Sequence, residues 1–293
     1  MNTTTRRHFL KTILAGSVLA GGCRTPVGRV SAARRRRVGS SRLNVAVLGV
    51  AGRGEACWRA VSAAGDRLVA LCDVDERALL AARDTLADTQ PGMRLYKDFR
   101  VLFEAERELD AVLIATPNHG HATQAAWAME RGCHVFIEPP LTHTLAEAAV
   151  LERKARQYDV ALWMGDEPAT HPEFRRAVTL LRGGIIGAVT EVHAWTARPV
   201  WPQGGNRPEG SDPVPPELDW ELWLCGAPPR PFKQRVYHRY NWRGWYDFGG
   251  GALGDVGCQL LSLPFRALDL GAPRTVTAEE VDGATSEMYP RAS

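Results

Sequence analysis

A glycine-rich loop is the first stretch of the chain whose residue types could bind a ligand. The run GVAGRG, from Gly49 to Gly54, follows the apolar stretch LNVAVLG and precedes a stretch with helical periodicity. Glycines let the backbone turn tightly and approach a pyrophosphate at the positive end of a helix. The strict GxGxxG pattern has glycine where Ala51 stands, so the match is GxAxxG with an extra glycine. The spacing predicts nucleotide contacts from Gly49, Ala51, Gly52, Arg53 and Gly54.

Asp73 supports the same site, because it lies 24 residues beyond Gly49 at the end of the next apolar run. A carboxylate at this place accepts hydrogen bonds from the ribose hydroxyls and disfavours a 2′-phosphate. We therefore expect NAD as the cofactor rather than NADP. The alternative is a Rossmann-like domain whose loop binds no nucleotide.

Short apolar runs alternate with helical stretches over the first half of the chain. Apolar strands without polar alternation, each followed by a helix of ten or more residues, are typical of βαβ units and of a parallel sheet buried on both faces. We expect a doubly wound Rossmann domain over residues 41–168. The expected strands are 43–49, 66–74, 110–117, 134–138 and 160–165, and the expected helices are 52–64, 76–89, 121–132 and 145–158.

The pattern changes after Pro168. A helix is expected over 174–184, a strand with one wet face over 188–198, a helix over 251–270 and another strand over 274–281. Six of the nine tryptophans lie between Trp195 and Trp245, in a stretch with little periodicity. They could form a surface that stacks on sugars or the core of a loop-rich insert. Residues 169–293 are thus expected to form an incomplete α+β open-sheet domain, and the fold class is α/β.

The first forty residues have the features of an export signal. Arg6 and Arg7 precede Phe-Leu-Lys and a short apolar run, which resembles the twin-arginine signal of bacteria. We expect export to the periplasm with the twin-arginine machinery as a partner, residues 1–40 being signal and basic linker. Cys23 could carry a lipid anchor, although its spacing is imperfect. The alternative is a disordered basic tail.

Charge and cysteine usage exclude other classes. Residues 1–40 hold nine of the 36 Lys and Arg and no acid, so the rest holds 27 basic and 33 acidic groups, a net charge of −6. An acidic body disfavours nucleic-acid binding, which needs a basic face. No apolar run approaches the 18 or so residues of a membrane span. The six cysteines show no paired spacing, so we expect buried thiols and no metal site.

The sequence resembles the Gfo/Idh/MocA family of nicotinamide-dependent oxidoreductases from Leu43 almost to the end. The resemblance is carried by VAVLGVAGRG, LCDVD, IATPNHGHA, HVFIEPPLTHT and GGGALGDVGCQLL. It implies a C-terminal sheet that often packs against another subunit, and so a homo-oligomer if that sheet is complete. The histidines after the expected strand over 110–117 could instead be solvent-facing residues of an ordinary loop, away from any cofactor. The resemblance adds these residues to the cofactor site: Thr116, Pro117, Asn118, His121 and Glu138.

The chain departs from the family at the positions that carry proton chemistry. Pro139 stands where the family has a lysine, and Gln259 stands where it commonly has a histidine, four residues after Asp255. Many relatives also have an aspartate where this chain has Ser262. Asp255 is therefore the remaining catalytic candidate, with the alternative that it only caps its helix. The chain also ends before the further strands of its relatives.

Two function classes remain from the residues. The first is an exported enzyme that acts on a sugar or polyol with tightly bound NAD, in redox-neutral chemistry because free NAD is scarce outside the cytoplasm. The second is a catalytically inactive nucleotide- or sugar-binding relative, since proline and glutamine cannot shuttle a proton. A truncated gene fragment is a third interpretation.

Overall fold

The computed structural model describes residues 42–277 and 287–290. The expected signal, Cys23 and the basic linker lie outside these residues. The chain divides into two units, one with the chain up to Met164 together with Pro213–Arg230, the other with Gly165–Asp212 and Pro231–Ser293. Residues 213–230 thus join the first unit, although the sequence pattern places them in the C-terminal domain.

The first unit is a parallel six-stranded sheet with the strand order β3-β2-β1-β4-β5-β6. This is the order of a Rossmann fold, as expected. The sequence pattern did not predict strand β3 or helix α4, because elements of three and seven residues carry little periodicity. Its elements are β1 (Asn44–Leu48), α2 (Arg53–Ala64), β2 (Arg67–Cys72), α3 (Glu76–Leu86), β3 (Arg94–Tyr96), α4 (Phe99–Ala105), β4 (Ala111–Ile114), α5 (Asn118–Glu130), β5 (His134–Ile137), α6 (Leu145–Tyr158), β6 (Leu162–Met164) and α9 (Trp220–Leu224).

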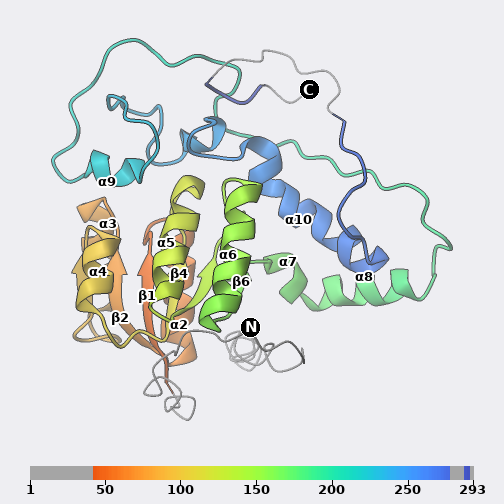
Figure 1. Ribbon diagram of the computed structural model, residues 1–293, viewed down its shortest axis with the longest axis horizontal. Helices are drawn as coiled ribbons and strands as arrows, with labels where there is room; N and C mark the ends of the chain where they lie inside the picture. Colours follow the sequence, from red (N-terminus) through yellow and green to blue (C-terminus); the bar gives the residue numbers. More distant parts are fainter. Residues whose placement is uncertain (1–41, 278–286, 291–293) are drawn as a thin grey trace. The chain divides into compact units, whose positions relative to one another are not determined.

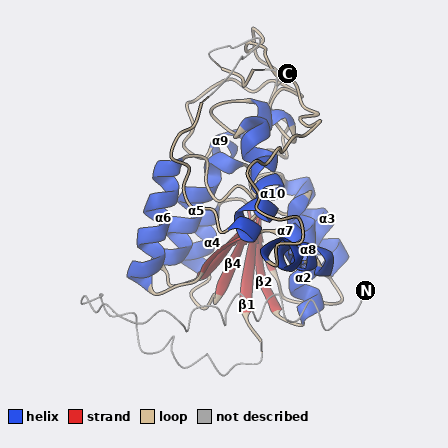
Figure 2. Ribbon diagram, turned by 90° about the vertical axis from the view of Figure 1, so that its right-hand side faces the viewer, coloured by secondary structure: helices blue, strands red, loops and turns tan. Residues whose placement is uncertain are grey.

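Helices cover both faces of this sheet (Figure 1). In β1, Val45 and Val47 pack with α2 and α3, whereas Ala46 and Leu48 pack with α4, α5 and α6. Figure 2 shows the two groups of helices on opposite sides of the strands. Because successive strand residues point to opposite faces, a strand apolar at every position requires this double cover.

Side-chain caps set where several of these helices begin. Asp75 accepts a hydrogen bond from the Arg77 amide at the start of α3, and Asp98 caps α4 in the same way. Thr144 and Glu147 form a capping box at the start of α6. Each cap satisfies amide groups that a helix leaves without partners in its first turn.

The second unit contains α7 (Glu167–Thr170), α8 (Pro172–Arg182), the 3₁₀-helix η2 (Asn241–Gly244) and α10 (Gly251–Leu268). Helix α10 packs against α7, α8 and η2. An aromatic cluster forms its core, in which Tyr237 has no exposed surface and lies 4.9 Å from the Trp245 ring and 5.5 Å from the Phe248 ring.

The strand expected over 188–198 is wrong: these residues form neither strand nor helix and are mostly exposed, with Trp195 at 80%. An alternating sequence becomes a strand only where a neighbouring strand accepts its hydrogen bonds, and none lies beside it in the described part of the chain. Residues 274–277 form no strand either, and the remainder of that expected strand lies outside the described residues.

The tryptophans between Trp195 and Trp245 divide into two groups. Trp195 is exposed, and the other five are at most 8% exposed. Such burial is that of core residues and leaves little ring surface for a sugar. The five buried rings are Trp201, Trp220, Trp223, Trp242 and Trp245.

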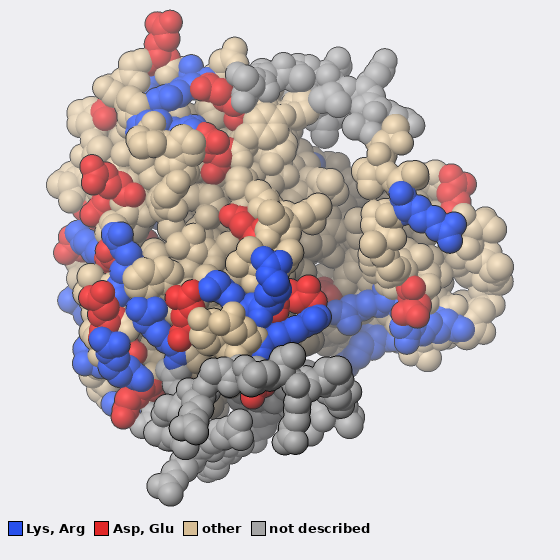
Figure 3. Space-filling model, in the orientation of Figure 1, with Lys and Arg blue, Asp and Glu red and all other residues tan. Residues whose placement is uncertain are grey.

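Charged side chains of both signs are intermixed over the face shown in Figure 3. No helix among the described residues is long and apolar enough to cross a membrane.

Candidate functional site

The glycine loop begins directly after β1, and two of its glycines are required by close packing. Gly49 has a φ of 76°, and a Cβ there would lie 2.8 Å from the carbonyl of Ala115. A Cβ on Gly54 would lie 1.8 Å from the carbonyl oxygen of Gly49. Real Cβ atoms do not approach backbone this closely, so the turn from β1 into α2 depends on both glycines.

Gly52 has a different role, because a Cβ there would meet no atom within 4 Å. It is the N-terminal residue before α2, has a φ of 58°, and caps the helix without a side-chain hydrogen bond. The first-turn amides of a helix attract anions, since the helix dipole places positive charge there. The loop therefore presents an open helix terminus suited to a phosphate group.

Asp73 ties this loop to the next connection of the sheet. Its Oδ2 accepts a hydrogen bond from the Val50 amide at 2.8 Å, and its Oδ1 accepts one from the Asp75 amide at 3.0 Å. Removal from water raises the pKa of Asp73, and the two amide donors act in the opposite direction. The carboxylate lies at the carboxyl ends of β1 and β2, where the sequence places a ribose contact.

The connection from β4 to α5 carries the next predicted residues. Thr116 Oγ1 donates to Gln124 Oε1 at 2.7 Å. Asn118 is 2% exposed, and its amide Nδ2 has no hydrogen-bond partner. A buried donor without a partner costs about 1–3 kcal/mol, so Asn118 is suited to donate to a bound ligand.

His121 is buried under the same connection. Its Nε2 lies 2.7 Å from the Thr116 carbonyl oxygen and its Nδ1 lies 2.9 Å from that of Pro140. The ring thus joins the loop after β4 to the loop after β5. With 1% of its surface exposed, His121 positions these loops, and direct contact with a cofactor stays a prediction.

The pH dependence of stability should report on His121. Burial lowers the pKa of this imidazole, and the carbonyl oxygens of Thr116 and Pro140 act in the opposite direction. Between the unfolded pKa of about 6.5 and the lower folded pKa, His121 is therefore protonated in the unfolded chain and neutral in the folded chain. We expect the free energy of unfolding to fall there by up to about 1.36 kcal/mol per pH unit.

Urea unfolding at several pH values, followed by tryptophan fluorescence, measures this slope. His121→Gln should lose its share of the slope, whereas His193→Gln, at an exposed imidazole, should keep it. An unchanged slope in His121→Gln would contradict the assignment.

Two further predicted cofactor residues pair with each other. Arg53 Nε lies 3.1 Å from Glu138 Oε2, across the ends of β1 and β5. Cys57 Sγ lies 3.5 Å from the other carboxylate oxygen, and burial raises the pKa of this thiol well above its usual range. Cys57 is therefore a neutral thiol, and no pattern in the sequence indicated its contact with Glu138.

The catalytic candidate Asp255 belongs to the second unit. Its Oδ1 accepts a hydrogen bond from Arg243 Nε at 2.9 Å, whereas the cap of α10 is Gly250, without a side-chain bond. Asp255 is thus an ion-pair partner and does not act as the N-cap of α10. Gln259 lies one turn further along α10 and is exposed.

Ser262 stands where many relatives have an aspartate, and a carboxylate from another residue lies beside it. Its hydroxyl donates to Asp166 Oδ2 at 2.7 Å, and Arg266 Nη2 donates to the same oxygen at 2.9 Å. Asp166 comes from the residues just after β6. The pairing joins residues 96 positions apart, so no local pattern could have predicted it.

No group of three or more His, Cys, Asp or Glu that could hold a metal ion occurs in residues 42–277 and 287–290.

Comparison with known proteins covers both units. Residues 43–166 match the model of an oxidoreductase family with an NAD-binding Rossmann fold, and residues 156–277 match the C-terminal alpha/beta domain of the oxidoreductase family. The rhizopine catabolism protein MocA of Rhizobium meliloti is 29% identical over 197 residues, which are 66% of this chain and 60% of that protein.

Two other relatives are similar over part of their length. A glycosyl hydrolase family 109 protein of Shewanella sp. strain ANA-3 is 28% identical over 207 residues, 64% of this chain and 44% of that protein. The structure of GenD2 from gentamicin A biosynthesis in complex with NAD has a TM-score of 0.54 at 21% identity, over 84% of this chain and 57% of that one, and shows the shared fold.

The chain spans 44% to 60% of the length of these two curated relatives. The matches to both family models cover residues 43–277, from the glycine loop to the helix that carries Asp255. The chain therefore belongs to the Gfo/Idh/MocA family of NAD(P)-dependent oxidoreductases.

Proposed function

We propose that this chain binds NAD in its first unit and belongs to an exported system that acts on a sugar or polyol. The observation that carries the proposal is the buried side-chain Nδ2 of Asn118, which has no hydrogen-bond partner. Asn118 follows β4, the strand that pairs with β1 and so lies next to the glycine loop. An open helix terminus at Gly52 and the carboxylate of Asp73 complete a set of groups that fit a dinucleotide. Such a set recognises phosphate, ribose and amide groups through different chemistry.

The residues present suit each part of the cofactor in turn. The amides after Gly52 would bind the pyrophosphate, Asp73 would accept from the adenosine ribose, and Asn118 would donate to an acceptor of the nucleotide. NAD, when bound, supplies a hydride acceptor. A carboxylate at position 73 repels a 2′-phosphate, which favours NAD over NADP.

The chain lacks proton-transfer groups at the two positions where the family commonly has them. Pro139 has neither a side-chain donor nor an amide hydrogen, and Gln259 cannot exchange a proton. These two residues favour the second candidate function, a nucleotide- or sugar-binding relative without turnover. Asp255 stays our catalytic candidate for the first candidate function, although its carboxylate pairs with Arg243.

The names of relatives support a substrate class. Proteins similar to this chain include a glycosyl hydrolase family 109 protein and D-xylose 1-dehydrogenase (NADP(+)) 2. Both names refer to carbohydrates, which supports a sugar or polyol as the ligand. Retained NAD and redox-neutral chemistry, in which the hydride returns to the same molecule, suit a compartment where free NAD is scarce.

The cofactor content of the purified protein tests the proposal. Folded protein is denatured, and the supernatant is analysed by mass spectrometry for NAD, NADH and their phosphorylated forms. We expect about one NAD or NADH per chain. Well-folded protein that carries no nucleotide, and takes up none when NAD is added, would overturn the proposal.

Removal of the Asp73 carboxylate should weaken NAD binding by roughly 10- to 150-fold, since a hydrogen bond to a charged group contributes about 1.5–3 kcal/mol. Asp73→Ala should also lose its preference for NAD over NADP. Calorimetric titration of nucleotide-free protein with each cofactor measures both effects.

The matched control is Asp66→Ala. Asp66 also accepts a backbone hydrogen bond, from the Leu43 amide at 3.0 Å, but at the opposite end of β1. It should leave the Kd for NAD unchanged. Equal affinities of Asp73→Ala and the original protein would remove Asp73 from the cofactor site.

Export rests on the paired arginines at positions 6 and 7. Replacement of both by lysine keeps the charge and removes the pair that the twin-arginine machinery reads. We expect the full-length double variant to remain in the cytoplasmic fraction of a bacterial host, while the original chain reaches the periplasm. Equal distribution of the two proteins would contradict the proposed route.

A further inference from the structure

A segment from the second half of the sequence crosses the nucleotide-binding edge of the first unit. We call residues 213–230 the strap; they contain α9 and belong to the first unit. At one end the Glu76 amide donates to the Glu217 carbonyl oxygen at 3.0 Å, and the Asp219 amide donates to that of Val74 at 3.0 Å. Leu218 and Asp75 form an antiparallel bridge between these bonds. The strap is therefore bound by main-chain hydrogen bonds to the connection that directly follows Asp73.

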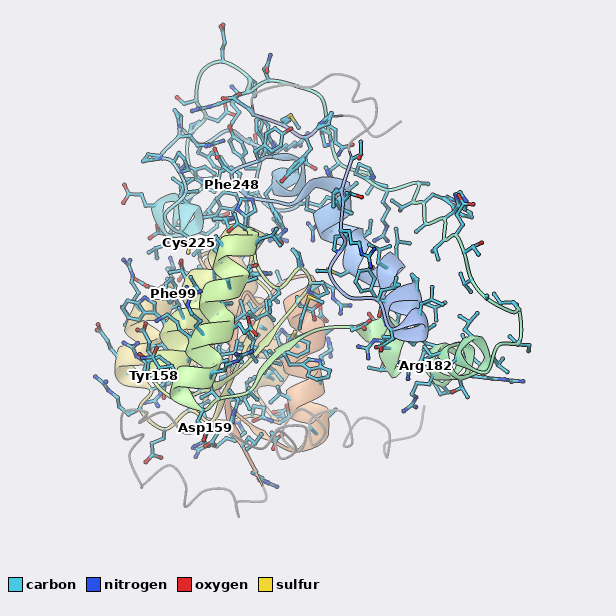
Figure 4. All side chains as sticks on the ribbon, turned by 45° about the vertical axis from the view of Figure 1, so that its right-hand side comes forward. Phe99, Tyr158, Asp159, Arg182, Cys225 and Phe248 are labelled. Atoms are coloured by element: carbon cyan, nitrogen blue, oxygen red, sulfur yellow. The ribbon has the colours of Figure 1, made fainter. Side chains whose placement is uncertain are left out.

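The other end of the strap lies on the first turn of α5. His119 Nε2 lies 3.0 Å from the Trp223 carbonyl oxygen, and the two rings lie 5.3 Å apart. Cys225, labelled in Figure 4, follows α9, and its Sγ lies 3.5 Å from where a Cβ on Gly120 would be. The strap is thus attached to the connection that contains Thr116, Pro117 and Asn118.

The strap is firmly built between these two attachments. Asp219 caps α9 by accepting from the Leu222 amide at 2.9 Å. The rings of Trp220 and Trp223 stack at 4.7 Å, and Trp220 Nε1 donates to the Arg230 carbonyl oxygen at 2.8 Å. Two stacked and buried aromatic rings, with the Trp220 donor paired, hold this short segment in one conformation.

The sheet topology defines what the strap crosses. Strand β1 lies between β2 and β4, and the glycine loop follows β1. The strap joins the connections after β2 and β4, so its ends flank that loop at the edge where Rossmann domains bind dinucleotides. Figures 1 and 2 show α9 beyond this end of the strands.

We propose that the strap closes the adenosine side of the dinucleotide site and must detach before the nucleotide can exchange. A bound dinucleotide would place its adenosine ribose at the acid that ends β2, and the strap holds the connection beside that acid to the start of α5. This inference rests on the proposed function. It gives the exported enzyme a way to retain NAD where none can be replaced.

A reversible cross-link tests the strap directly. Gly120 has no positive φ, and a Cβ there would lie 3.5 Å from Cys225 Sγ, close enough for a disulfide. It would also lie 3.2 Å from Gln124 Nε2 and 3.4 Å from Thr116 Oγ1, so the oxidised variant is compared with the same variant in reduced form. Full-length Gly120→Cys is loaded with NAD under reducing conditions and then oxidised, and peptide mass spectrometry confirms the disulfide between the introduced thiol and Cys225. Exchange of bound NAD for isotope-labelled NAD is then followed with time. We expect exchange at least 10-fold slower in the oxidised form, with recovery after dithiothreitol.

The matched control is Gly120→Cys with Cys225→Ser, which cannot form the bond and should exchange at the same rate in both redox states. In the opposite direction, Glu217→Ala removes the ion pair of 2.6 Å with Arg77 Nη1. It should accelerate exchange by about two- to five-fold, as expected for an exposed pair.

Equal rates of NAD exchange in the oxidised and reduced forms, with the cross-link confirmed, would overturn the proposed role of the strap and leave the proposal of NAD binding intact. A reduced variant and original protein that both bind no NAD would overturn the proposed function and the strap together. If Gly120→Cys does not fold, hydrogen–deuterium exchange on the original protein tests the same role of the strap. Added NAD should increase protection of the Glu76 and Asp219 amides and leave α8 unchanged, and unaltered protection at both amides would overturn the strap.

Discussion

Gly54→Ala is expected to destabilise the first unit severely. The added Cβ would lie 1.8 Å from the Gly49 carbonyl oxygen and 2.7 Å from its carbonyl carbon. Both atoms are backbone at the end of β1, so no flexible side chain can move aside. Relief would require β1 and α2 to separate, although Val45, Val47, Trp58 and Val61 of these elements pack together in the core. We expect a loss of about 4 kcal/mol or more, a large part of the roughly 5–15 kcal/mol that stabilises an ordinary domain.

Thermal unfolding followed by circular dichroism measures this loss, and retained NAD provides a second readout. Gly271→Ala is the matched control, because a Cβ there meets nothing within 4 Å and its φ is not positive. That variant should unfold within about 0.5 kcal/mol of the original protein. If Gly54→Ala folds and binds NAD as the original protein does, the close packing of the glycine loop is not required.

Restoration of the two proton-handling residues is expected to increase turnover strongly. Pro139→Lys supplies an ammonium that can donate to a reacting hydroxyl, and Gln259→His supplies a general base. One positioned general acid or base contributes about 10²- to 10⁴-fold in rate. We expect the double variant to exceed the original chain by at least about 10²-fold in the rate of product formation from a panel of inositols, aldoses and aryl glycosides. Products are measured by mass spectrometry and, for the aryl glycosides, by the absorbance of the released aryl alcohol, because redox-neutral turnover leaves the absorbance of NAD unchanged.

The control for this gain is the same double variant with Asp255→Ala, which should lose it. Each single variant should gain less than the pair, since each supplies only one of the two proton-transfer groups. Turnover by the original chain equal to that of the double variant would show that Pro139 and Gln259 do not limit the reaction. Absence of a gain, with NAD bound and the protein folded, would favour the binding function.

Asp166 shows why site prediction from the sequence stops at the family pattern. The resemblance marks position 262 as one that often carries an acid, so serine there suggests a loss. In the structure Ser262 and Arg266 both donate to Asp166, so a carboxylate is present and comes from another element. Only the packing of α10 within its unit brings these side chains together.

Most of the first unit could be predicted from the sequence because its signals are local. Uninterrupted apolar strands require helices on both faces, glycines at positions 49, 52 and 54 require a turn, and Asp73 follows directly after β2. Each of these depends on neighbours within a few residues, which a pattern can represent.

The tertiary structure decided what depends on distant partners. The strap at residues 213–230 joins the first unit through the amides of Glu76 and Asp219, which lie far apart in the sequence. Residues 188–198 alternate like a strand yet form none, because a strand needs a partner and the pattern describes only one side of the pair. The sequence alone thus determined five of the six strands and the glycine loop, but not β3. The attachment of the strap beside that loop, and the partners of Cys57 and Ser262, were decided only by contacts that the folded chain creates.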